Sequence, residues 1–251
     1  MMSPADLIKI GLIGGILSFD YVSGLRLMLH QPIVAAPLTG YLLGDLGFGV
    51  TIGILLQLVY IGEISIGASR ADDVAIASVV SVASGAHMKV DGIAAASIAA
   101  GISFGHLGGL ADVWATRLNP ILIRRIERRI ERGRSGGLWF PLLIAAVTAF
   151  SISGAISAVG SMAAGYAFRY LLNPPPQFVG MGLVWGERLI PAVGIAVLLN
   201  SLQIRFERFI FLVACVITLL ATSLIELRVG IAIAISIAAI ASAFWIVKGK
   251  I

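Results

Sequence analysis

The sequence predicts an all-α polytopic membrane protein, with multiple transmembrane helices and with short, broken or re-entrant helical hairpins in its N-terminal third. Its 251 residues are 59% hydrophobic and 12% charged, with a mean hydropathy of +1.00. Soluble domains carry about 25% charged residues. Long stretches of low charge also recur from one end of the chain to the other, as they do in proteins that cross a bilayer repeatedly.

Apolar segments alternate with polar or glycine- and proline-rich breaks. They cover residues 7–29, 32–43, 48–61, 74–86, 92–114, 138–172, 178–200, 209–225 and 229–247. A full span needs about 20 residues, so several of the early segments are too short to cross. We interpret residues 32–86 as half-helices, re-entrant hairpins and tilted spans around a site. The segment 138–172 is too long for one span, and we expect a break near Gly154 or Gly160.

The first apolar segment predicts an uncleaved span. Asp6 and Lys9 are followed by an apolar run that continues into the body of the chain, without a separate cleavable signal pattern. Asp20 lies inside this run. Because acidic residues are rare within a membrane and usually have a function there, Asp20 is a candidate site residue, with Arg26 as its candidate partner.

The break at residues 62–73 is the most informative feature of the chain. A stretch with several polar residues, including Glu63 and Ser65, interrupts the apolar sequence. Asp72 and Asp73 follow this stretch, and the apolar sequence resumes after them. Irregular backbone and ionisable groups at membrane depth are tolerated where they are buried in protein or line a wet cavity. Broken segments of this kind indicate the substrate site of a transporter.

A basic segment lies in the middle of the chain. Residues 117–134 hold seven arginines against Glu127 and Glu131, with isoleucines near helical spacing. This pattern predicts a basic amphipathic helix at the membrane surface, on the cytoplasmic side. The segment lacks interleaved aromatic residues, so we expect no nucleic-acid partner. It divides the chain into membrane regions at 1–116 and 137–251, with a cytoplasmic segment at 117–136 between them.

A block in the first third resembles a known transporter family. The stretch QPIVAAPLTGYLLGD at 31–45 is followed by glycines at 49 and 53, LQL at 56–58, IG at 61–62 and 66–67, and DVAIA at 73–77. This order and spacing resemble the IIC subunit of mannose/sorbose-type permeases of the bacterial phosphoenolpyruvate-dependent sugar phosphotransferase system. The specific similarity covers about residues 10–85.

The resemblance implies a multi-pass protein of the bacterial inner membrane that handles sugar but is not itself an enzyme. In this family, IIC pairs with a membrane subunit, IID, and sugar moves inward through the complex. A cytoplasmic IIB protein, charged by IIA, then phosphorylates the sugar. We therefore expect IID, IIB, IIA, sugar and membrane lipids as partners, an oligomeric assembly, and neither a cofactor nor a metal. Cys215, the single cysteine, allows no internal disulfide.

Several positions depart from the family pattern. Gln57 stands where the common form carries a glutamate, and Asp72 lies where many members have proline. The usual acid shortly before Pro32 is absent, and Asp20 is the candidate replacement. These departures keep open a second hypothesis, a degenerate relative that acts as a sensor or scaffold without transport. An intramembrane enzyme is less favoured, because the histidines at 30, 87 and 106 are scattered and no H-E-x-x-H or G-x-S-x-G motif occurs.

The candidate substrate-binding residues are Gln57, Glu63, Ser65, Asp73 and Asp20. The amide of Gln57 can hydrogen-bond a sugar hydroxyl with both of its ends, or it can bond a neighbouring helix. Glu63 and Ser65 either line the site or cap a loop. Asp73 is expected to cap the following helix, whose N-terminus would then point at the site. Asp72 is expected to be solvated or paired with Arg70, and Asp45 to be structural.

Overall fold

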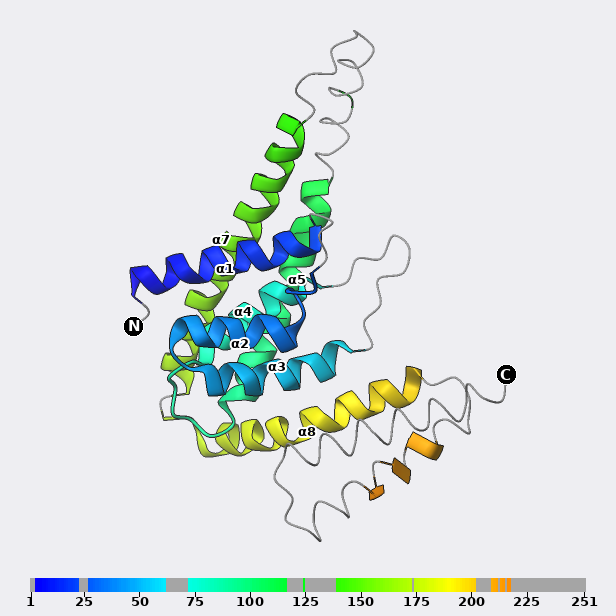
Figure 1. Cartoon of the computed structure of the whole chain (residues 1–251). Helices are drawn as coiled ribbons and strands as arrows, with labels where there is room; N and C mark the ends of the chain where they lie inside the picture. The colour runs from blue at the N-terminus through cyan, green and yellow to red at the C-terminus, as the bar shows by residue number, and fades with distance from the viewer. Residues whose placement is uncertain are drawn as a thin grey trace, which may run out of the picture. The chain divides into compact units, whose positions relative to one another are not determined.

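All elements that the computed structural model describes are α-helices, which confirms the predicted fold class (Figure 1). The model describes residues 3–22, 27–61, 72–116, 124, 139–172, 174–201, 209–211, 213–214 and 216–217. The helices are α1 (Pro4–Val22), α2 (Pro32–Leu43), α3 (Leu46–Tyr60), α4 (Val74–Gly85), α5 (Ile93–Thr116), α7 (Trp139–Leu171) and α8 (Gln177–Ser201). The chain forms two compact units, residues 1–194 and 195–251, and the first holds the predicted site.

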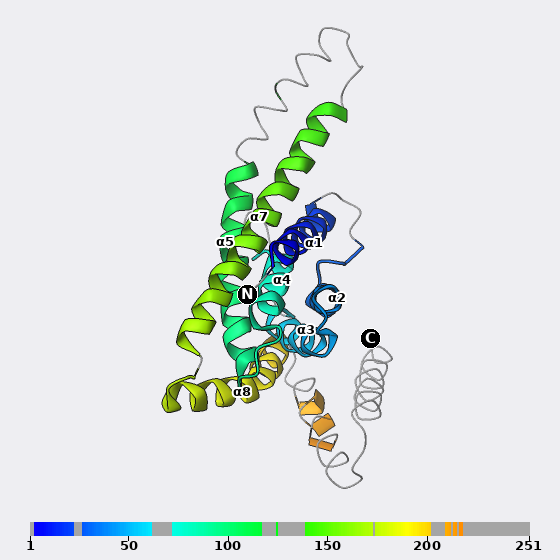
Figure 2. The same cartoon turned by 90° about the vertical axis from the view of Figure 1, so that its left-hand side faces the viewer.

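Helix α4 lies at the centre of the first unit. It packs against α1, α2, α3, α5 and α7, and Figure 2 shows it between α5 and α7 on one side and α1, α2 and α3 on the other. Every residue of α4 from Ala75 to Gly85 is buried. Its sequence alternates valine and isoleucine with alanine and serine, and such small side chains let neighbouring backbones approach closely within a membrane.

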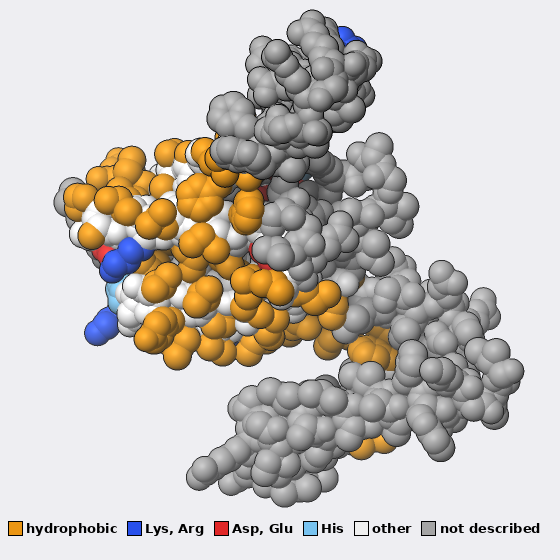
Figure 3. All heavy atoms as spheres, turned by 45° about the horizontal axis from the view of Figure 1, so that its top comes forward, with side chains coloured by type: hydrophobic (Ala, Val, Ile, Leu, Met, Phe, Trp, Pro, Cys, Tyr) orange, Lys and Arg blue, Asp and Glu red, His pale blue; other side chains and the backbone are white. Residues whose placement is uncertain are grey.

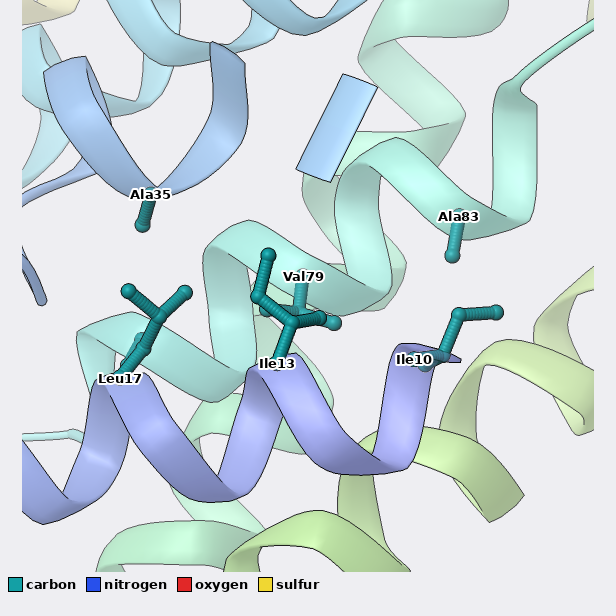
Figure 4. Packing of buried hydrophobic residues seen from close by; sticks show 7 residues of the cluster. Ile10, Ile13, Leu17, Ala35, Val79 and Ala83 are labelled. Carbon is teal, nitrogen blue, oxygen red and sulfur yellow. The ribbon is translucent and has the colours of Figure 1, made fainter. Parts of the chain in front are cut away.

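Two clusters of buried side chains form the core. The first joins α1, α2 and α4 through Ile10, Ile13, Leu17, Ala35, Ala75, Val79 and Ala83. Figure 4 shows the three α1 side chains of this cluster directed toward α2 and α4. The second joins α2, α3, α4 and α5 through Ala36, Ile52, Leu56, Ala77, Val82, Ala94 and Ile98.

Helices α2 and α3 form a tight antiparallel hairpin. Pro32 opens α2, and Gly44 closes it in the left-handed conformation with φ of 81°, which favours glycine. Asp45 then caps α3 by accepting a hydrogen bond from the backbone N–H of Phe48 at 3.2 Å. A Cβ atom added at Gly49 would lie 2.7 Å from the carbonyl oxygen of Ala36. The two backbones are therefore in direct contact.

The helix lengths confirm the prediction of short elements in the first third. Helices α2, α3 and α4 have 12, 15 and 12 residues, or about 18–22 Å at 1.5 Å per residue, which is short of the ~30 Å hydrocarbon core. Among the described residues, the segments Ile93–Trp114, Ala146–Leu171 and Gln177–Val197 are long and apolar enough to cross a membrane. Large apolar side chains such as Ile8, Leu12 and Ile16 are exposed on the outer face of α1.

Two boundary predictions are wrong. Helix α7 is continuous over 33 residues, so the chain does not break at Gly154 or Gly160. These glycines instead provide space for neighbouring helices, because a Cβ at Gly154 would lie 2.6 Å from the carbonyl oxygen of Gly11. The first helix is Pro4–Val22, and residues 27–29 of the first apolar segment are not helical. The basic segment 117–134, apart from Arg124, lies outside the described residues, and so does Cys215.

Candidate functional site

Polar side chains gather where α1 and α3 end and where α2 and α4 begin. We call this set the break-end cluster, because it flanks residues 62–71, which lie outside the described part of the chain. It comprises Asp20, His30, Gln31, Gln57, Tyr60, Asp72, Asp73 and His106 of α5. Three of the five predicted site residues, Asp20, Gln57 and Asp73, belong to it. The other two, Glu63 and Ser65, fall outside the described residues.

Asp20 holds the turn between α1 and α2. Its side chain is buried, and its two oxygens accept hydrogen bonds from the backbone N–H groups of Leu27 at 2.8 Å and Leu29 at 2.9 Å. The second oxygen also lies 3.2 Å from Nδ1 of His30. These bonds hold Leu27 and Leu29, which are not helical, against the last turns of α1. Arg26, the predicted partner, lies outside the described residues.

Gln57 connects α3 to the first turn of α2. Its Oε1 accepts the backbone N–H of Ile33 at 3.3 Å, and its Nε2 donates to Oε1 of Gln31 at 3.1 Å. Gln31 occupies the N-cap position of α2 but makes no capping bond with its own side chain. Gln57 therefore supplies an acceptor that a helix N-terminus needs. One further lone pair and one further N–H remain on the amide, so sugar contact stays a prediction.

Asp73 caps α4, as the sequence predicts. Its carboxylate accepts the backbone N–H of Ile76 at 3.0 Å, and its own backbone N–H donates to the carbonyl oxygen of Gly105 in α5 at 3.0 Å. A Cβ at Gly108 would lie 3.0 Å from Cβ of Asp73. The absence of side chains at these two α5 glycines lets the start of α4 lie directly against α5.

His106, Asp72 and Tyr60 form a hydrogen-bonded arrangement that the sequence did not predict. Nδ1 of His106 lies 2.8 Å from one oxygen of Asp72, and the Tyr60 hydroxyl donates to the other oxygen at 3.4 Å. Asp72 was expected to be solvated or paired with Arg70, which lies outside the described residues. The available signal was the glycine-rich stretch around His106, which predicts close approach of another backbone but does not identify it.

The opposite end of the bundle carries a second polar region. His87 donates from Nε2 to the carbonyl oxygen of Leu43 at 2.8 Å, and its backbone N–H donates to Asp45 at 3.3 Å. These two bonds attach the tip of the α2–α3 hairpin to the end of α4. Asp45 is therefore structural, as predicted.

A cavity of about 180 Å³ lies beside this region, between α1, α4 and α7, with Asp6 and Arg169 in its lining. The hydroxyl and backbone N–H of Ser3 donate to Asp6 and lower the pKa of that carboxyl. Figure 3 shows basic, acidic and histidine side chains near the end where α1 begins, beside a surface that is otherwise hydrophobic. Asp20, Gln57 and Asp73, the predicted site residues that the structure describes, do not line this cavity.

The long apolar helices and the polar ends of the half-length helices define a polytopic helical membrane protein with ionisable groups in its interior. Among the described residues, no group of three or more His, Cys, Asp or Glu side chains could hold a metal ion. The family model described as the sorbose-specific IIC component of the phosphotransferase system matches residues 5–245. The chain belongs to this family of sugar phosphotransferase membrane components and is an integral protein of the bacterial inner membrane.

Individual relatives agree with this assignment. The chain is 29% identical over 185 residues to the fructose permease IIC component of Bacillus subtilis (strain 168), covering 72% of this chain and 67% of the relative. It is 25% identical over 200 residues to the sorbose-specific EIIC component of Klebsiella pneumoniae, covering 75% and 72%.

Two solved structures share the fold. One, described as the structure of a membrane protein, has a TM-score of 0.73 at 20% identity. The other is a mannose transporter in complex with a microcin, with a TM-score of 0.54 at 19% identity. Each similarity covers 98% of this chain and 96% of the other.

Proposed function

We propose that this chain is the IIC subunit that binds a hexose-type sugar and carries it across the membrane to a cytoplasmic IIB protein, which phosphorylates it. The family assignment supports a role in sugar transport, since the named relatives act on fructose or sorbose. The likeness to a mannose transporter supports a membrane complex with a IID-type subunit. IIA would recharge IIB, and the phosphoryl group would never reside on this chain.

The observation that carries the proposal is the break-end cluster. Apolar half-length helices bring carboxylate, amide, phenol and imidazole groups together at one end of the first unit. Sugar hydroxyls both donate and accept hydrogen bonds, and such mixed groups match them. Half-helix ends at membrane depth are also where transporters hold their substrates. Asp20, Gln57 and Asp73 are proposed sugar-site residues, as are Glu63 and Ser65 of the break.

The second candidate is a sensor or scaffold that does not transport. It is favoured by one observation: both ends of the Gln57 amide already bond to α2 and its cap residue. A residue occupied in this way is less available to a sugar than the glutamate of the common family form.

Uptake by the assembled complex tests the proposal. Membrane vesicles would contain this chain with its IID subunit, and IIA, IIB and phosphoenolpyruvate with the general phosphotransferase proteins would be supplied on the cytoplasmic side. Labelled D-fructose, D-mannose and L-sorbose would be offered separately. We expect at least one to accumulate as its phosphate, with no label from phosphoenolpyruvate on this chain when the samples are quenched without acid. Binding without accumulation or phosphorylated product would favour the sensor, and label on this chain would contradict the proposed division of labour.

A further inference from the structure

His106 is an exposed imidazole on a helix that can cross the membrane. Its side chain is 67% exposed, and it lies within the apolar segment Ile93–Trp114 of α5. An ionisable side chain facing hydrocarbon is costly, and such residues usually face a water-filled cavity or a polar partner. The exposed edge of this ring therefore requires a polar neighbour in the working complex.

The bonds of His106 fix the direction of its ring. A carboxylate can only accept hydrogen bonds, so the 2.8 Å contact with Asp72 places a hydrogen on Nδ1. In the neutral ring, Nε2 then carries a bare lone pair, and no residue that the structure describes hydrogen-bonds to it. Tyr60 holds the second oxygen of the same carboxylate. General-base catalysis uses this arrangement: one ring nitrogen accepts the proton, and a third group orients the ring through a hydrogen bond to the other nitrogen.

The other histidine–carboxylate pair of the cluster has a different character. The side chains of His30 and Asp20 are 16% and 4% exposed, against 67% and 20% for His106 and Asp72. Asp20 is also bonded to two backbone N–H groups of the α1–α2 turn. The His30 pair is therefore built into the fold, whereas the His106 pair presents its ring outward.

We infer that Nε2 of His106 accepts the proton of the sugar hydroxyl while that hydroxyl is phosphorylated. The inference rests on the proposed function. In the step, the hydroxyl oxygen forms a bond to phosphorus and its proton moves to Nε2. The bond between phosphorus and the donor atom of phosphorylated IIB breaks, and its electron pair stays on that donor atom. The proton then leaves His106 to water. Asp72 and Tyr60 are positioning residues, and this chain never carries the phosphoryl group.

The place of His106 along α5 fits this role. Ten residue steps separate it from Thr116, the last residue of the helix, which is about 15 Å at 1.5 Å per residue. The basic segment predicted to face the cytoplasm begins directly after Thr116. His106 therefore lies nearer the end of α5 that is predicted to face the cytoplasm, the side from which phosphorylated IIB approaches.

The test compares His106→Asn with Ser103→Ala in the assembled complex. Asparagine places an amide N–H near the position of Nδ1, so it keeps the bond to Asp72 while removing the base. With phosphorylated IIB and the sugar that wild type takes up, we expect His106→Asn to lower kcat for sugar phosphorylation about 100-fold or more. Its Kd for that sugar should change less than threefold. Ser103→Ala, on the same helix but outside the break-end cluster, removes only a hydroxyl that bonds to the carbonyl oxygen of Ala99, and it should keep kcat within threefold of wild type.

Chemical rescue separates proton transfer from a structural role. Added imidazole should restore part of the rate of His106→Ala and leave Asp72→Asn unchanged, because only the former lacks the ring. If His106→Ala does not assemble with IID, the asparagine variant alone decides. An unchanged kcat in His106→Asn, or a loss of sugar binding that accounts for the whole defect, would overturn the inference. A wild-type complex that neither binds nor phosphorylates sugar would instead overturn the proposed function.

Discussion

Adding one methyl group to the α2–α3 hairpin should have opposite effects at two neighbouring glycines of α3. A Cβ at Gly49 would meet only backbone: the carbonyl oxygen of Ala36 at 2.7 Å, Cα of Gly40 at 3.0 Å and Cα of Pro37 at 3.2 Å. No side-chain rotation can relieve these contacts. A Cβ at Gly47 would meet nothing within 4 Å. Gly47→Ala is thus a matched control on the same helix.

The expected magnitudes follow from two opposing effects. Alanine is favoured over glycine in a helix by up to about 1 kcal/mol, which applies to both positions. Overpacking at Gly49 costs about 1–3 kcal/mol, so Gly49→Ala should be less stable than Gly47→Ala by that amount. At about 2–4 °C per kcal/mol for a chain of this size, the difference in Tm is about 2–12 °C.

Thermal unfolding of the two purified variants in the same detergent measures this difference, with wild type as the reference. Equal melting temperatures, or a Gly49→Ala variant that is the more stable of the two, would show that the hairpin is not packed backbone to backbone. The reasoning on helix contacts in this region would then be wrong.

Two further predictions concern the site and the topology. Gln57→Ala should weaken sugar binding by about 1–3 kcal/mol, the cost of leaving buried polar groups unpaired; unchanged binding in a complex that still contains IID would limit Gln57 to holding α2. A cysteine introduced as Ser135→Cys, on a Cys215→Ala background, should resist an impermeant thiol reagent in intact cells, because the arginines before it predict a cytoplasmic loop; ready labelling from outside would reverse the predicted orientation.

The sequence predicted best where local chemistry decides the structure. The bounds of α2 agree with the apolar segment 32–43, because Pro32 can open a helix and Gly44 can close one. The capping role of Asp73 follows in the same way from the apolar residues after it. The non-helical course of residues 27–29 could not be predicted from the apolar pattern, since Asp20 receives N–H groups from residues seven and nine positions later.

The candidate site was predicted in its location but only partly in its members. The break between apolar segments pointed to the end of the bundle where the break-end cluster lies, and Asp72 is part of that break. The partner of Asp72 is 34 residues away and meets it only because α4 and α5 pack closely at Gly105 and Gly108. No periodicity along the chain encodes that contact. The continuity of α7 through Gly154 was missed for the same reason, because the space for α1 lies in a different helix.

The bonds of His87 determine which helices would travel together in a transport cycle. Separating the hairpin from α4 would leave the Leu43 carbonyl and the Asp45 carboxylate without these partners, at a cost of about 0.5–1.5 kcal/mol for each hydrogen bond lost. We therefore expect the hairpin and α4 to shift as a single rigid body. Helix α5 would belong to the same body, because the backbone N–H of Asp73 donates to the carbonyl oxygen of Gly105 and Asp72 bonds to His106.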